Sequence, residues 1–94
     1  MAEWTFVALD LKERLCRMEQ FGFEKEQGSE KIEFVITVRE YLSPPDPAMT
    51  FLAQADKQTN QRTAPFTPVG WGPNLSTALA ECVKAIRRFP YEPA

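Results

Sequence analysis

Apolar residues recur at helical spacing near the C-terminal end of the chain, and this is the strongest regular pattern in the sequence. Within residues 74–89 they fall on one face of a helix, at Leu75, Ala78, Leu79, Cys82, Val83 and Ile86. Asn74 is a favourable N-cap because its side-chain oxygen can accept a hydrogen bond from a first-turn N–H. Pro90 cannot continue a helix. The pattern therefore predicts a helix over residues 74–89 with one buried face.

Alternation of apolar and polar residues predicts strands in the middle of the chain. In residues 32–42 the apolar face carries Ile32, Phe34, Ile36 and Val38, and the opposite face carries Glu33, Val35, Thr37, Arg39 and Tyr41. Residues 49–58 alternate in the same way, and Leu52 and Gln54 fall on the less apolar face. Residues 66–72 predict a third strand, which Pro68 would confine to an edge or a bulge.

A weaker helical pattern begins at Asp10 and ends before Gly22, a residue type that suits the end of a helix. Asp10 and Glu13 have the spacing of a capping box, and the apolar stripe is narrow, with Leu11, Leu15 and Met18. The charged stretch 24–31 is interpreted as a solvated connector or a hairpin tip. Residues 1–9 are interpreted as a short strand or an arm, and residues 90–94 as a short tail.

These elements predict a single domain over residues 1–94 of the α+β class, with the order α-β-β-β-α. We expect a two-layer sandwich in which two helices pack on one face of an antiparallel three-stranded sheet. The sheet would have four strands if residues 4–9 pair with it.

Composition and charge argue against several classes of function. The 94 residues carry a formal net charge of −2 and 44% hydrophobic residues, which suits one ordinary globular domain. No apolar run is long enough to span a bilayer, and the first residues lack the pattern of a signal peptide, so a cytoplasmic location is expected. The two cysteines, Cys16 and Cys82, both fall in predicted helices and are expected to be reduced.

The residues that usually carry catalysis are missing or scattered. There is no histidine, which is the commonest general acid or base at neutral pH and the usual activator of a cysteine nucleophile. The carboxylates form no recognisable catalytic motif, and the glycines do not have the spacing of a phosphate-binding loop. We therefore expect a protein that is not an enzyme and that holds no cofactor and no metal.

The predicted element order resembles that of double-stranded-RNA-binding domains. Those domains place lysines at the start of the last helix, whereas this chain has Asn74, Leu75, Ser76 and Thr77 there. Nucleic-acid binding is therefore the alternative hypothesis, and its candidate residues are basic: Lys57, Arg62, Lys84, Arg87 and Arg88.

The preferred hypothesis is a small non-enzymatic binding or accessory module. Its candidate contact residues are those expected on the sheet face away from the helices, together with a tryptophan between two glycines: Val35, Tyr41, Leu52 and Trp71. The module would recognise a protein partner or a second copy of itself through this outer face. A simpler alternative is that the arm formed by residues 4–9 covers the same face.

Overall fold

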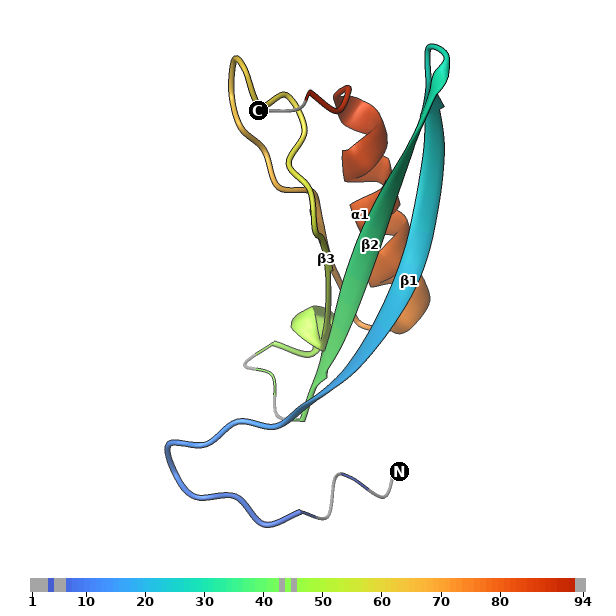
Figure 1. The fold of residues 1–94 in the computed structure, drawn as a ribbon. Coiled ribbons are helices and arrows are strands. Elements are labelled where there is room, and N and C mark those ends of the chain that lie inside the picture. The colour runs from blue at the N-terminus through green and yellow to red at the C-terminus, as the bar shows by residue number, and fades with distance from the viewer. Residues whose placement is uncertain (1–3, 5–6, 43, 45, 93–94) are drawn as a thin grey trace.

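The computed structural model describes residues 4, 7–42, 44 and 46–92, and it has an α+β fold with one four-stranded antiparallel sheet and one C-terminal helix (Figure 1). The strands follow the order β1-β2-β3-β4 across the sheet. Their bounds, with those of a short 3-10 turn and the helix, are β1 Cys16–Gln27, β2 Glu30–Tyr41, η2 Pro47–Met49, β3 Phe51–Ala55, β4 Val69–Gly72 and α1 Leu75–Arg88.

Strands β1 and β2 form a long hairpin whose turn end extends beyond the part of β2 that pairs with β3. Their register pairs Gln27 with Glu30 next to the turn and Cys16 with Tyr41 at the far end. Gly28 lies in the turn with φ of 65°, a conformation that glycine adopts at no steric cost. The hairpin-tip interpretation of residues 24–31 therefore holds for the turn, while the flanking charged residues belong to the two strands.

The predicted N-terminal helix is wrong, because its second half is strand β1. The capping-box contact does form, since Glu13 Oε1 accepts a hydrogen bond from the Asp10 N–H at 2.8 Å, but only a turn follows it. From Cys16 onward, pairing with β2 satisfies the backbone groups of alternate residues and lets Phe21 and Phe23 pack against the core. Gly22 consequently lies inside a strand and not at the end of a helix. The sheet gains its fourth strand from these residues. Residues 4 and 7–9 are not part of it, and residues 5 and 6 of the predicted N-terminal strand lie outside the described residues.

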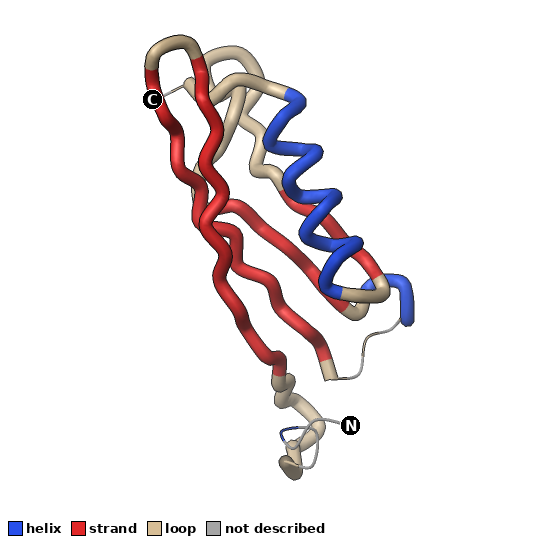
Figure 2. The backbone as a smooth tube through the Cα atoms, turned by 90° about the vertical axis from the view of Figure 1, so that its right-hand side faces the viewer, coloured by secondary structure: helices blue, strands red, loops and turns tan. Residues whose placement is uncertain are grey.

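Helix α1 covers one face of the sheet, so the molecule has two layers (Figure 2). The predicted faces of β2 are confirmed, since Phe34, Ile36 and Val38 are buried under the helix. The rest of the core comes from β3 and α1, with Ala53, Ala55, Ala78, Cys82 and Ile86. Asn74 caps the helix as predicted, because its side-chain oxygen accepts a hydrogen bond from the Thr77 N–H at 2.8 Å. Among the described residues, α1 is the one helix on this face, and Tyr91 of the C-terminal tail packs beside it against the core.

Two glycines allow α1 to lie very close to β4. A Cβ atom on Gly70 would lie 2.5 Å from the Cys82 nitrogen, and one on Gly72 would lie 2.8 Å from the Ala78 nitrogen. Only residues without a side chain allow such a close approach between strand and helix. Because of this approach, α1 lies mainly over β4, β3 and β2, and the core-facing side of β1 is only partly covered.

Hydrogen bonds from β1 hold the C-terminal tail and the end of α1 against the hairpin. Gln27 binds the Tyr91 backbone twice, donating to its carbonyl and accepting from its N–H, each at 2.8 Å. Lys25 Nζ donates to the carbonyls of Ile86 and Phe89 at 3.1 Å, which places a positive charge at the carbonyl end of α1. The described part of the predicted tail is thus an integral part of the fold.

Candidate interaction site on the outer sheet face

The sheet face opposite α1 carries one continuous row of large side chains that crosses all four strands. The register pairs Met18 with Arg39, Arg39 with Leu52, and Leu52 with Trp71. Neighbouring strands are about 4.8 Å apart, so this outer row is roughly 14 Å long. Met18 and Trp71, at its two ends, are 53% and 39% exposed, which is high for side chains of this size and apolarity.

Tyr41 enlarges the row at the β4 side. Its ring stacks on that of Trp71, with 6.2 Å between the ring centroids and an angle of 25° between the ring planes. Val69 lies one residue pair further along β4 and is 39% exposed. We call the outer row together with Tyr41 and Val69 the outer patch. A stacked pair holds both rings in fixed orientations, so little conformational freedom is left to lose on binding.

Arg39 is the charged member of the outer row, and it is half-buried between Met18 and Leu52. It makes no ion pair with any residue that the structure describes. Guanidinium groups pair well with carboxylates at interfaces because they offer several donors in a planar fork. The outer patch therefore combines apolar and aromatic surface with one available positive charge.

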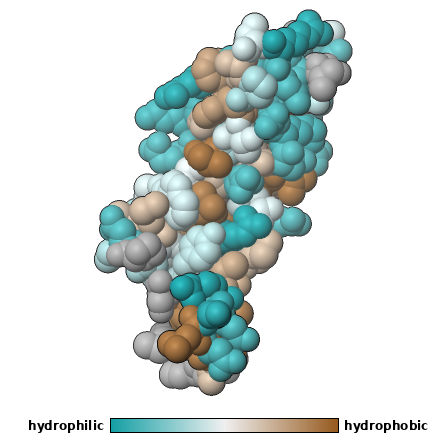
Figure 3. All heavy atoms as spheres, turned by 90° about the vertical axis from the view of Figure 1, so that its left-hand side faces the viewer, coloured by the Kyte–Doolittle hydropathy of each residue, from teal (hydrophilic) through white to brown (hydrophobic). Residues whose placement is uncertain are grey.

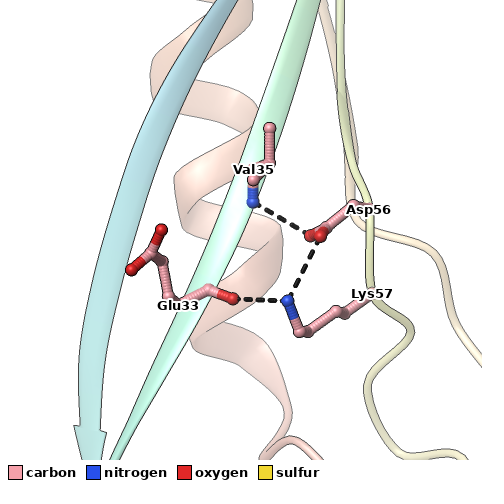
Figure 4. Close-up of polar contacts among 4 residues, drawn as sticks. All are labelled: Glu33, Val35, Asp56 and Lys57. Atoms are coloured by element: carbon pink, nitrogen blue, oxygen red, sulfur yellow. Dashed lines mark hydrogen bonds and ion pairs between the residues drawn. The ribbon is translucent and has the colours of Figure 1, made fainter.

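The structure brings together three of the four residues predicted to bind a partner. Tyr41, Leu52 and Trp71 belong to the outer patch, whereas Val35 lies six residues from Tyr41 along β2, or about 20 Å. Near Val35 the outer face is polar (Figure 4).

Hydrogen bonds around Val35 join β2 to the end of β3, and we call this group of bonds the clasp. The Val35 N–H donates to Asp56 Oδ1 at 2.9 Å, and Lys57 Nζ donates to the Glu33 carbonyl at 2.7 Å and to Asp56 Oδ2 at 3.2 Å. These bonds extend the contact between the strands beyond Ala55, where β3 ends. Their role is structural, and the pair Thr37 and Gln54 lies between Val35 and the outer patch.

The described N-terminal residues do not cover the outer patch. In Figures 1 and 2 the segment 7–15 continues past the lower end of β1 and lies beyond the sheet. Figure 3 shows hydrophobic groups exposed on this segment, in agreement with Leu11, which is 97% exposed. A hollow of about 560 Å³ separates the segment from the end of β2, with Leu9, Leu11, Leu15, Tyr41 and Leu42 among its lining residues. The predicted covering arm, residues 4–9, lies partly outside the described residues.

Sequence reasoning missed three members of the outer patch. Met18 was assigned to a helix, and Arg39 and Val69 were not singled out. Arg39 could have been found, because it falls on the same face of the alternating run as Tyr41. Met18 needed the pairing of β1 with β2, which no local pattern reveals.

The basic residues of the alternative hypothesis are only partly free. Lys57 is bound in the clasp, and Arg62 Nε lies 3.9 Å from Glu92 Oε2. Lys84, Arg87 and Arg88 are exposed on α1, on the opposite side of the molecule from the outer patch. Lys84, Arg87 and Arg88 thus remain as exposed basic residues on α1, and Arg62 is exposed in the loop despite its contact with Glu92.

The Cys82 thiol offers little reactive chemistry. Cys82 is fully buried, and burial raises the pKa of its thiol to about 11, so it is protonated at neutral pH. Cys16 lies on the outer face of β1, away from the core that holds Cys82, and both are free thiols. Cys16 is therefore in a strand and not in the predicted helix. In the part of the chain that the structure describes, no three residues among Cys, Asp and Glu are grouped so that they could hold a metal ion.

The chain matches no protein-family model, no curated protein and no solved structure. Within the described residues, no helix has the length and apolar character needed to cross a membrane.

Proposed function

We propose that the protein is a non-enzymatic binding module that recognises another protein through the outer patch. The observation that carries the proposal is the stacked pair Tyr41 and Trp71 beside Leu52 and the unpaired Arg39. Tryptophan, tyrosine and arginine are the residue types that supply most binding energy in protein interfaces. Here they lie together on one face that no described segment covers.

The partner surface should be apolar and should carry a carboxylate. Apolar partner groups would fill the space beside Trp71 and Met18, and an aspartate or glutamate would pair with Arg39. Methionine at the rim suits such a contact because its flexible side chain adapts to the shape of the partner. The acidic residues Glu24 and Glu33, which face each other near the hairpin tip, mark the other end of the outer face as solvated.

Site-specific photo-cross-linking in the native host tests the proposal. A photoreactive amino acid replaces Gln54, which is exposed on the outer face beside Leu52, and in a matched variant it replaces Lys84 on the exposed side of α1. We expect one protein to cross-link from position 54 and not from position 84. Its binding in purified form should be weakened by Arg39→Glu and restored when the contacting carboxylate of the partner is changed to lysine.

Three outcomes would overturn the proposal. The first is that position 54 captures nothing, and the second is that position 84 captures the same protein equally well. The third is that position 54 captures a second copy of the chain, which would make the outer patch a self-association surface. Capture of a nucleic acid from position 84 would support the alternative based on Lys84, Arg87 and Arg88.

A further inference from the structure

Strand β1 is a long edge of the sheet that carries charged side chains but no proline. It runs for 12 residues from Cys16 to Gln27 without a proline, and no described segment pairs with its free side. The other edge, β4, has only 4 residues and is flanked by Pro68 and Pro73. Natural proteins commonly shorten an edge strand or place prolines on it to prevent pairing with other chains. Strand β4 has this protection and β1 does not.

The backbone groups at the free side of β1 follow from the contacts of β2. Val35 directs its backbone toward β3, because its carbonyl accepts from the Asp56 N–H at 3.0 Å and its N–H donates to the Asp56 side chain. Its partner on β1 is Gly22, whose N–H and carbonyl must then point away from β2. By alternation the same holds for every even-numbered residue of β1. The free side therefore presents a ladder of unpaired donors and acceptors centred on Gly22.

No contact among the residues that the structure describes requires Gly22. A Cβ atom there would meet no other atom within 4 Å, and its φ is not in the left-handed region. Glycine weakens the interior of a strand and often marks a place where another backbone approaches closely. Gly22 is therefore compatible with a second backbone lying close beside β1.

Apolar surface lies beside this ladder on the helix side of β1. Phe21 and Phe23 are only partly buried, because α1 lies mainly over the other three strands. On the helix, Leu79 and Val83 are partly buried too. Pairing at the edge of β1 would place further side chains against both phenylalanines.

We propose that β1 pairs antiparallel with β1 of a second copy, about a twofold axis through Gly22, and joins two four-stranded sheets into one. In this register Gly22 faces Gly22 of the second copy, Phe21 faces its Phe23, and Glu19 faces its Lys25. Each of the last two pairs occurs twice because the axis repeats it. The helices of both copies then lie on the same side of the joined sheet.

Charge selects this register over its neighbours. The two neighbouring registers differ from this one by a shift of two residues along the strand. One of them places Arg17 opposite Lys25 of the second copy, and the other places Phe21 opposite that lysine. Opposite charges across a strand pair stabilise it and like charges destabilise it. Within one chain, Lys25 Nζ binds carbonyls at the end of α1 and Glu19 Oε1 lies 2.9 Å from Arg17 Nη2, so both charges lie on the helix side of β1 and the pairs across the axis would add to these contacts.

Sedimentation equilibrium of the full chain with two charge variants tests the pairing. Glu19→Lys and Lys25→Glu each place two like-charged pairs across the axis, so each should dimerise about tenfold more weakly than the unmodified chain. Because Lys25→Glu also loses the bonds to the carbonyls at the end of α1, circular dichroism first checks that both variants are folded. A mixture of the two variants restores two opposite-charge pairs, so we expect it to form a heterodimer. Trp71→Ala should leave dimerisation unchanged, which separates this surface from the outer patch.

Hydrogen exchange of the unmodified chain gives a second readout that needs no variant. The N–H groups of Gln20, Gly22 and Glu24 should exchange more slowly as the protein concentration rises, while that of Val69 on β4 should not change. A monomer at the highest soluble concentration, a dimer that ignores both charge variants, or a dimer that Trp71→Ala dissolves would each overturn the proposal.

Discussion

Gly70→Ala and Gly22→Ala make the same chemical change at two strand positions with opposite surroundings. The added carbon at Gly70 would lie 2.5 Å from the Cys82 nitrogen and 2.8 Å from Glu81 Cβ, both in α1. The first of these neighbours is backbone, so it cannot rotate away, and the helix must move off β4. At Gly22 the added carbon meets open space.

The expected difference in the free energy of unfolding is large. Forcing an extra carbon into a tightly packed contact costs about 1–3 kcal/mol, and the backbone contact places Gly70→Ala at about 3 kcal/mol or more. Gly22→Ala should change stability by less than about 1 kcal/mol and in the stabilising direction, because alanine restricts the unfolded chain. Urea denaturation of both variants at several protein concentrations measures the difference, and extrapolation to concentrations at which the chain is monomeric removes the contribution from association.

Similar midpoints for the two variants, with unchanged slopes, would refute the reasoning. That result would mean that α1 and β4 do not approach each other as closely as the two glycines allow. The offset of the helix, and with it the partial exposure of Phe21 and Phe23, would then lose its explanation.

Three further predictions concern the helix. Burial raises the pKa of Cys82 from 9.0 to about 11, so the protonated thiol stabilises the folded state by about 2–3 kcal/mol. This contribution is complete below pH 9 and is lost as the pH rises to about 11. The free energy of unfolding of Cys82→Ala, measured from pH 8 to about 11, should not show this loss. Asn74→Ala should cost about 1 kcal/mol in urea denaturation because it removes the N-cap, whereas Ser76→Ala should change stability by less than about 0.5 kcal/mol. Ile86→Ala should lower the free energy of unfolding by about 2–5 kcal/mol and Leu79→Ala by less, since only Ile86 is fully buried, and an equal loss would contradict the orientation of the helix.

Local patterns predict correctly those elements in which the spacing of apolar residues along the sequence matches the face that is buried. The helix at residues 74–89 and the strand at residues 32–42 both have a continuous apolar face, an entry signal or a clear alternation, and both were predicted nearly to their ends. Strand β1 lacks this agreement. Its core-facing positions include Glu19 and Lys25 as well as two phenylalanines, so alternation is visible only once β2 is known to pair with it.

The sequence pattern predicts which side of the sheet the residues of the outer patch face, but it does not predict which of them lie together. Alternation alone assigned Tyr41 and Leu52 to the side away from the helix. The stacking of Tyr41 on Trp71 depends on the β3–β4 register, which a sequence pattern does not determine. Alternation also gave Val35 the correct face, but it contains no information about which residues of one face are neighbours.

The affinity of the cross-linked partner for single-site variants tests the central claim most directly. Calorimetric titration of the purified partner would compare the unmodified chain with Trp71→Ala and with Lys84→Ala, after circular dichroism has shown that both variants are folded. Trp71 should behave as an anchor residue, so its removal should weaken binding by at least about 2 kcal/mol, or roughly 30-fold, while Lys84→Ala should leave affinity within about twofold. Equal affinities for Trp71→Ala and the unmodified chain would contradict the assignment of the outer patch as the binding surface.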